Sequence, residues 1–256
     1  MEHLKPDLTL RISERQMRRW NAIHSDEFAL HATANSENSP YRFVTLSRDE
    51  GSLGDDIAVQ LANRLGWRLF DKEIVDYIAE NNHVREDIVR QLDERSQGLV
   101  HEAILRFLEM PESTPFGSDE YRRSLVKTLA ALATHGSAVL VGRGANFALF
   151  GSEHGLHVRI TGSLEVRAQR VSEIRKIPVE KARSCLMAVD ADRRSFIRHH
   201  FRREFDDFRY YDLMVNTDRL SIERAVDSIL SAMIPETSLL ENRVPQSSLT
   251  RQLRVE

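Results

Sequence analysis

The sequence predicts an α/β protein in which helices cover both faces of a mostly parallel β-sheet. Short apolar runs of strand character alternate with helical patterns through residues 41–234. One of these runs, 137–141, is nearly continuously apolar, as expected of a parallel strand buried on both faces. Glycines and serines stand at the ends of several helical patterns, where helix stops and N-caps are favoured. Alternation of this kind is typical of a doubly covered parallel sheet.

The first half of this region contains two expected strands and two expected helices. Residues 42–47 are rich in β-branched side chains and bounded by polar residues, which indicates a strand. Apolar residues then recur every four positions up to Gly66, so a helix ends there. Residues 67–70 form a second short apolar run that ends at Asp71. Leucines at helical spacing mark a helix over 119–134, which Gly136 closes.

The second half continues the same alternation. A strand is expected over 156–160, and Ser163 is a suitable N-cap for the helix after it. Pro178 fits the first turn of a long helix, because proline lacks the N–H that this turn leaves unpaired. A last strand is expected over 211–215. Ser221 then caps a final helix with apolar residues at the helical period.

Composition divides the chain into three segments. Residues 1–40 are polar and form an N-terminal extension with one helix-like patch, Met17–Ile23, and a linker. Residues 41–234 carry nearly all of the periodic apolar signal and form the main domain. Residues 235–256 form a polar C-terminal tail. We expect the two terminal segments to dock on the core, on a second copy of the chain in a homodimer, or on a protein partner.

The overall composition excludes several classes of function. The chain has 256 residues with 36 Lys+Arg and 39 Asp+Glu, so its net charge of −3 gives no global field for holding nucleic acid. No apolar run approaches the roughly 18 residues that a membrane span needs. The start of the chain lacks a signal-peptide core. The lone Cys185 excludes an intrachain disulfide. We therefore expect a cytoplasmic protein that binds neither membrane nor, despite its basic segment 193–203, nucleic acid.

The junction between the first strand and the helix after it is the candidate phosphate-binding loop. A glycine-bearing turn at this position can surround an anion with backbone N–H groups and the positive end of the helix dipole. Against the pattern G-x-x-x-x-G-K-[ST], however, only Gly54 is in register, because Asp49, Asp55 and Asp56 occupy the other three defined positions. Spacing alone therefore leaves open a plain strand-to-helix turn with acidic residues in the first helical turn.

Four stretches of the chain resemble the cytidylate kinase-like family. Residues 46–58 resemble its degenerate P-loop, 70–74 its F/Y-D-K-E-I segment, 141–146 its V-G-R-G-A-N segment, and 190–194 with 211–217 its lid helix and closing strand. The resemblance spans about residues 42–234. It implies a P-loop kinase-like three-layer fold with a helical lid. It also implies a nucleotide-binding transferase that uses ATP and Mg²⁺ to phosphorylate CMP or a related nucleoside monophosphate.

The resemblance also implies roles for particular residues. ATP and its magnesium ion would contact the candidate loop, through Ser47, Arg48, Gly51, Ser52, Gly54 and Asp56. The acceptor monophosphate would contact Asp71, Gly142 and Arg143. The lid arginines Arg193, Arg194 and Arg198 would close over the transferring phosphoryl group. Each assignment has a plainer alternative: Asp71 as a helix cap, Arg143 as a surface loop residue, and the lid arginines as a solvated basic face answered by Glu204, Asp206 and Asp207.

One departure from the family pattern bears on activity. Asp55 occupies the position at which nucleotide kinases place a lysine on the β- and γ-phosphates, and Leu53 replaces a glycine. At an effective dielectric constant of 20, like charges about 4 Å apart repel by roughly 4 kcal/mol. The alternative hypothesis is therefore a catalytically weak or inactive regulatory module on the same fold.

Overall fold

A computed structural model gives the structure of the protein and describes residues 40–92, 97–98, 100–101, 104–105 and 118–234. The predictions for the N-terminal extension and the C-terminal tail concern residues outside this range, and they stay predictions. The elements are, in chain order, β1 (Phe43–Arg48), α2 (Gly54–Leu65), β2 (Arg68–Phe70), α3 (Lys72–Glu80), α4 (Asn82–Arg90), α6 (Ser118–His135), β3 (Ala138–Val141), α7 (Ala145–Ala148), β4 (Gly155–Thr161), α8 (Leu164–Arg175), α9 (Val179–Phe201), η2 (Phe208–Tyr210), β5 (Leu213–Asn216) and α10 (Ile222–Ala232).

The five strands of the described residues form one parallel sheet in the order β2-β3-β1-β4-β5. The predicted parallel sheet is therefore confirmed. β1 lies at the centre, with Leu46 opposite Val141 of β3 and Val158 of β4. Because neighbouring parallel strands end at the same edge, the loops that follow β1 and β3 lie side by side.

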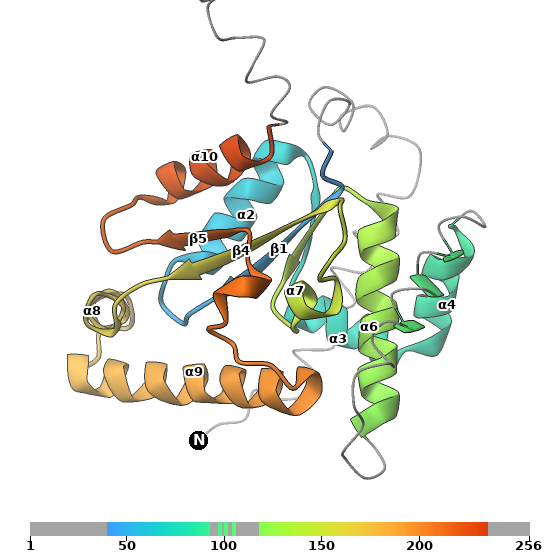
Figure 1. Cartoon of the computed structure of the whole chain (residues 1–256). Helices are drawn as coiled ribbons and strands as arrows, with labels where there is room; N and C mark the ends of the chain where they lie inside the picture. The colour runs from blue at the N-terminus through green and yellow to red at the C-terminus, as the bar shows by residue number, and fades with distance from the viewer. Residues whose placement is uncertain (1–39, 93–96, 99, 102–103, 106–117, 235–256) are drawn as a thin grey trace, which may run out of the picture.

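Alternating strand residues divide the core into two halves, one on each face of the sheet. On one face, Val44 and Leu46 pack with the apolar side chains of α2 and α10. On the other face, Phe43 and Leu140 pack with those of α3 and α6. Figure 1 shows this three-layer arrangement, with α2 and α10 on one side of the strands and α3, α6 and α7 on the other.

Helices α8 and α9 form a third, smaller packing unit at the carboxyl edge of the sheet (Figure 1). Their contact buries Ala168, Val171, Ala182 and Leu186. Gly51, in the loop after β1, lies directly against this pair, since a Cβ at Gly51 would be 3.0 Å from the Val171 side chain. The long helix expected as the lid, α9, thus belongs to a helical pair that packs on the candidate phosphate loop.

Most predicted elements occur within one or two residues of their expected ends. Ser163 and Ser221 are the N-caps of α8 and α10, as predicted. Pro178 is one position earlier than predicted, at the N-cap of α9 rather than in its first turn. β5 begins at Leu213, two residues later than expected. Helices α3, α4 and α7 are not assigned by the sequence patterns above.

Candidate active site

The loop after β1 turns sharply before α2 begins. Gly51 and Leu53 have φ values of 76° and 64°, in the left-handed region that favours glycine. Gly54 is required by close approach, because a Cβ there would lie 2.5 Å from Cβ of Arg48. The first-turn N–H groups of α2 have no acceptor within the helix, as at any helix start. The predicted glycine-bearing turn is therefore present.

Two polar residues of this loop point inward and hold it to the sheet. The buried Asp49 carboxylate accepts hydrogen bonds from Arg159 at 2.8 Å and from Thr161 at 2.7 Å. The Ser52 hydroxyl donates to the Asp49 carbonyl at 2.8 Å, and the Ser52 carbonyl accepts from Thr217 at 3.0 Å. Both side chains are thus structural anchors, and the Ser52 hydroxyl is turned away from the loop surface.

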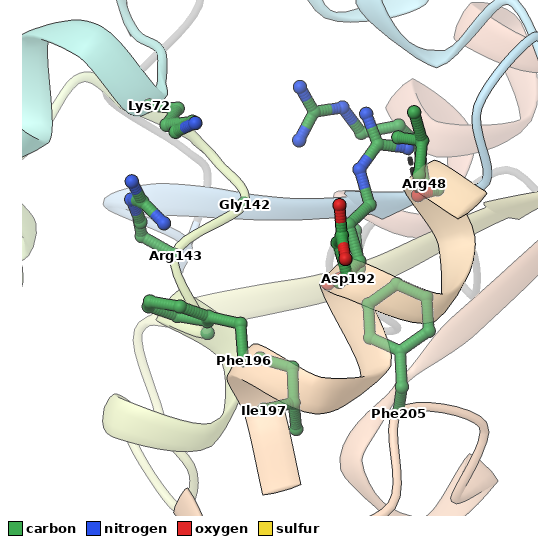
Figure 2. Close-up of a pocket in the computed structure, with 12 residues that line it drawn as sticks. Arg48, Lys72, Gly142, Arg143, Asp192, Phe196, Ile197 and Phe205 are labelled. Atoms are coloured by element: carbon green, nitrogen blue, oxygen red, sulfur yellow. Dashed lines mark hydrogen bonds between the residues drawn. The ribbon is translucent and has the colours of Figure 1, made fainter. Parts of the chain in front are cut away.

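A cavity of about 450 Å³ opens at the carboxyl edge of the sheet, between the end of β1, the loop after β3 and α9; the predicted loop residues Gly51, Ser52 and Gly54 are not among the residues that line it. Among the described residues that line it are four cations, and they come from four places in the fold: Arg48 at the end of β1, Lys72 at the start of α3, Arg143 after β3, and Arg193 on α9. Figure 2 shows Lys72 and Arg143 on one side of the cavity and Arg48 on the other. The remaining lining residues are Ser47, Gly142, Gly144, Val189, Asp192, Phe196, Ile197 and Phe205.

The loop after β3 presents Arg143 to this cavity. Gly142, Arg143 and Gly144 all have positive φ, at 76°, 52° and 67°. The Arg143 guanidinium makes a bidentate pair with Asp76 of α3, in which Nε donates to Oδ1 at 2.5 Å and a terminal nitrogen, NH2, donates to Oδ2. Its Cζ lies 4.7 Å from the centroid of the Phe196 ring. Arg143 is therefore a cavity-lining residue whose guanidinium is fixed by Asp76 and Phe196, and it is not a solvent-exposed loop arginine.

Behind this pair stands Tyr121 of α6. Its hydroxyl donates to Oδ1 of Asp76 at 2.9 Å. Burial, and after it the Asp76 charge, raise the pKa of Tyr121, so the phenol stays protonated and remains a donor.

Arg193 and Arg48 each form an ion pair with a carboxylate of the chain. The two terminal nitrogens of Arg193 donate to the Arg48 carbonyl at 3.0 Å and to the Glu50 carboxylate at 2.7 Å. Arg48 donates through Nε to Asp55 at 2.9 Å. Burial, and after it the charge of Arg48, lower the pKa of Arg193, while Glu50 opposes that shift.

Glu50 also ties the loop to α8 and α9 through its backbone. Its N–H donates to Asp190 at 2.9 Å, and its carbonyl accepts from Arg167 at 2.8 Å. Arg167 and Asp190 are themselves paired at 2.7 Å in a buried contact. The backbone N–H and carbonyl of Glu50 therefore bind the loop after β1 to α9 and α8.

The other two predicted lid arginines do not line the cavity. Arg194 pairs with Asp206 at 3.1 Å and Arg198 with Glu204 at 2.9 Å, and both pairs are largely exposed. For these two residues the observed contacts are those of the alternative, a solvated basic face. The structure brings Arg193 alone of the three lid arginines to the cavity.

The remaining predicted site residues divide in the same way. Ser47 lines the cavity, with its hydroxyl donating to Asn146 at 3.2 Å. Gly142 lines it as well, whereas Asp56 is exposed at the start of α2. Asp71 caps α3 by accepting from the Ile74 N–H at 3.0 Å, and burial is the main cause that raises its pKa.

Sequence reasoning did not single out seven lining residues as parts of the site, and four of them carry polar, charged or aromatic side chains: Lys72, Asp192, Phe196 and Phe205. Two signals point to three of them. Lys72 directly follows the carboxyl end of β2, and residues 189, 192, 193, 196 and 197 share one face of α9 at helical spacing. Asp76 was missed too, and a carboxylate one turn into α3 has no signal of its own in a single sequence.

Together the parallel sheet and the cationic cavity at its carboxyl edge define a kinase-like α/β protein. The model of the cytidylate kinase-like family matches residues 43–219. The chain therefore belongs to the cytidylate kinase-like family, and the resemblance read from the four sequence stretches is confirmed.

The named relative and the solved structures that resemble this chain share little sequence identity with it. A cytidylate kinase from Methanocaldococcus jannaschii is 28% identical over 104 residues, which cover 40% of this chain and 58% of that kinase. A solved structure of an uncharacterized protein from Eubacterium ventriosum has a TM-score of 0.58 at 19% identity, covering 75% of this chain and 97% of that one. A shikimate kinase from Acinetobacter baumannii has a TM-score of 0.40 at 17% identity, covering 85% and 99%.

The described residues contain neither a membrane-spanning helix nor a cluster of side chains that could hold a metal ion. No helix there is long and apolar enough to cross a membrane. No group of three or more His, Cys, Asp and Glu side chains is placed there to hold a metal ion.

Proposed function

We propose that this protein binds ATP and a nucleoside monophosphate, CMP or a close relative, and transfers the γ-phosphoryl group between them. The observation that carries the proposal is the convergence of Arg48, Lys72, Arg143 and Arg193 on one cavity at the sheet edge where α/β proteins bind ligands. Phosphoryl transfer needs positioning and charge compensation rather than covalent help from the protein. Four cations from separate elements supply both.

The acceptor phosphate belongs on the side of Arg143 and Lys72. An arginine suits a phosphate because its planar guanidinium can donate two parallel hydrogen bonds. Gly142 makes room for the Arg48 side chain, since a Cβ there would lie 2.7 Å from a terminal nitrogen of Arg48. Phe196 offers an apolar ring beside the phosphate site. Asp71, next to Lys72 in the chain, caps α3 and is not among the residues that line the cavity, so its proposed contact with the acceptor is not supported by this geometry. The choice of CMP rests on the family and on the cytidylate kinase relative.

The donor nucleotide belongs on the side of the loop after β1. The triphosphate would bind along the loop through backbone N–H groups near Gly51 and Gly54, beside Ser47 and Arg48, which line the cavity. The Ser52 side chain contributes only through the loop backbone, because its hydroxyl is engaged inside. Arg193 would bind the phosphoryl group in transit. Arg194 and Arg198 can reach it only after leaving Asp206 and Glu204.

The residues present fit a magnesium ion that is carried by the nucleotide. Magnesium in such sites is commonly held by one or two carboxylates together with substrate phosphates and water. Asp56 and Asp55 are exposed carboxylates in the first turn of α2, beside the loop. When bound, the ion supplies neutralisation of the donor phosphates, and Asp56 would contact it directly or through water.

A second candidate function, a catalytically weak or inactive regulatory module, is favoured by a different observation. Asp55 stands in place of the phosphate-binding lysine and pairs with Arg48, while Glu50 pairs with Arg193. Two cations that a nucleotide would need are thus already neutralised by the protein.

Thermal unfolding with ligands tests whether the site binds nucleotides. A ligand at about 100 times its dissociation constant adds roughly 2.7 kcal/mol of stability, a shift of several degrees for a chain of this length. We expect ATP with magnesium and one monophosphate among CMP, UMP and AMP each to raise the unfolding temperature, and that pair to support turnover. No shift with any nucleotide would contradict the proposal.

The variant Asp55→Lys separates the two candidate functions. A weakened kinase should gain phosphoryl transfer when a lysine replaces the carboxylate near the donor phosphates. A regulatory module should gain nothing while remaining folded. Asp87→Lys is the matched control, because it makes the same charge change at an exposed position on α4 that does not line the cavity.

A further inference from the structure

We propose that Asp76 is a positioning residue that aims Arg143 at the phosphate of the acceptor. The inference rests on the proposed function, and it adds a residue that no sequence motif singled out. Asp76 does not line the cavity; it acts on the ligand through Arg143.

The geometry of the pair leaves the useful edge of Arg143 exposed to the cavity. A guanidinium has five N–H donors in a rigid fork. Asp76 takes the side edge, through Nε and NH2, by binding one oxygen to each nitrogen. One hydrogen of NH1 and one of NH2 remain on the end edge, which is the edge that grips a phosphate through two parallel bonds.

The same guanidinium is held from two further directions. Its plane is covered by Phe196 of α9, with Cζ 4.7 Å from the ring centroid. Tyr121 of α6 donates to the Asp76 oxygen that receives Nε, and so fixes the carboxylate in turn. The Arg143 and Asp76 side chains are only 16% and 20% exposed. Helices α3, α6 and α9 therefore converge to hold one side chain in one orientation.

The sign of the effect distinguishes positioning from simple electrostatics. The Asp76 charge repels an incoming phosphate, so removing that charge alone should tighten binding. If the orientation of Arg143 matters more, removing one of its two acceptor oxygens should weaken binding instead. Positioning and electrostatics thus predict opposite changes for the nearly isosteric substitution Asp76→Asn.

A double-mutant cycle on the full chain tests the proposal, with affinity for CMP, UMP and AMP measured by titration calorimetry. We expect Asp76→Asn to weaken binding of the preferred monophosphate about tenfold and to leave ATP affinity unchanged. Arg143→Met should weaken monophosphate binding more strongly. In the Arg143→Met background, Asp76→Asn should no longer weaken binding, because the residue that it positions is gone and only the loss of a repelling charge remains.

Two more variants separate positioning from loss of structure. Tyr121→Phe keeps the pair and removes only the hydroxyl behind it, so we expect a two- to threefold loss of monophosphate affinity. Asp87→Asn, which breaks an exposed pair with Arg90 on α4, should change nothing. A fall in the unfolding temperature of Asp76→Asn without a change in affinity would mean a structural role and would overturn the inference.

The outcomes also separate this inference from the proposed function. If the native chain binds a monophosphate and Asp76→Asn leaves its affinity unchanged or tighter, the inference fails and the proposed function stands. The inference also fails if the two substitutions act additively. If the native chain binds no nucleotide, the proposed function fails and takes the inference with it.

Discussion

The loop after β1 and the loop after β3 lie side by side at the carboxyl edge of the sheet, and each brings an arginine-rich surface to the same cavity. Around the loop after β3, Asp76 binds Arg143 along its side edge and leaves the end of the fork open. Around the loop after β1, the Arg48 carbonyl and Glu50 bind both terminal nitrogens of Arg193. In these contacts Arg143 uses only one of its two terminal nitrogens, whereas Arg193 uses both.

The difference teaches that a carboxylate beside a cationic site has no fixed effect on anion binding. A carboxylate on the Nε edge fixes the guanidinium and leaves donors for the ligand. A carboxylate on the terminal nitrogens takes the place of the ligand, so a phosphate must displace it. Atom-level geometry, rather than the number of charges in the cavity, decides which effect wins.

The largest expected effect concerns the glycines that shape the loop after β3. Gly144 has a φ of 67°, and a Cβ there would lie 2.2 Å from the buried ring of Phe201. We expect Gly144→Ala to lower the free energy of unfolding by about 3 kcal/mol, because left-handed backbone and overpacking act together. Chemical denaturation measures this loss.

Gly98→Ala is the matched control for that prediction. Gly98 lies in a helical stretch, and a Cβ there meets no atom within 4 Å. Alanine is favoured over glycine in a helix, so the control should stabilise the protein by about 0.5 kcal/mol. Equal effects of the two substitutions would refute the role assigned to the loop geometry.

The second prediction tests the comparison between the two arginines. Glu50→Gln should tighten binding of ATP about tenfold, or roughly 1.4 kcal/mol, because the amide competes less well than a carboxylate for Arg193. The sign is opposite to that expected for Asp76→Asn. Titration calorimetry on both variants measures the contrast.

Glu165→Gln serves as the control for Glu50→Gln. It breaks an exposed ion pair between Glu165 of α8 and Arg183 of α9, neither of which lines the cavity. Its nucleotide affinity should equal that of the native chain. Weaker binding by Glu50→Gln would show that Glu50 orients Arg193 instead of competing with the ligand.

The fold was largely predictable because burial leaves a periodic trace in a single sequence. The parallel strands, the Ser163 and Ser221 caps and the α8–α9 pair all follow from local patterns of apolar and capping residues. Helices α3 and α4 were harder, since each has only nine residues and they bury few large side chains. Helix α7, with four residues, is too short to carry a periodic signal.

The candidate site was predictable in outline but not in its pairings. Arg48, Gly142, Arg143 and Arg193 line the cavity and were named from the family resemblance; the first three lie at or just after strand ends. Which carboxylate answers which arginine depends on contacts between residues far apart in the chain, such as Asp76 with Arg143 and Glu50 with Arg193. No local pattern records such contacts, so Arg194 and Arg198 looked equivalent to Arg193 from the sequence.

The smallest expected effect is a pH dependence on the side of the cavity that holds Arg143. The centroid of the His200 ring lies 4.4 Å from that of Phe196 and 5.5 Å from that of Tyr121. Burial, and then the charges of His199, Arg143 and Arg122, lower the pKa of His200 to about 4. In the unfolded chain the pKa of His200 is near 6.5. Between about pH 4 and 6.5 this imidazole therefore binds more protons in the unfolded chain than in the folded chain.

Stability should therefore fall as the pH is lowered from about 6.5 toward 4, with carboxylates also titrating at the acidic end of this range. His200→Gln should flatten this slope, by about 2 °C of unfolding temperature at the acidic end. His157, which is also buried with a lowered pKa, should keep the remaining slope in that variant. His83→Gln, an exposed position on α4, should leave the slope unchanged. An unchanged slope in His200→Gln would place the proton uptake elsewhere, and the side of the cavity around Arg143 would then be insensitive to pH in this range.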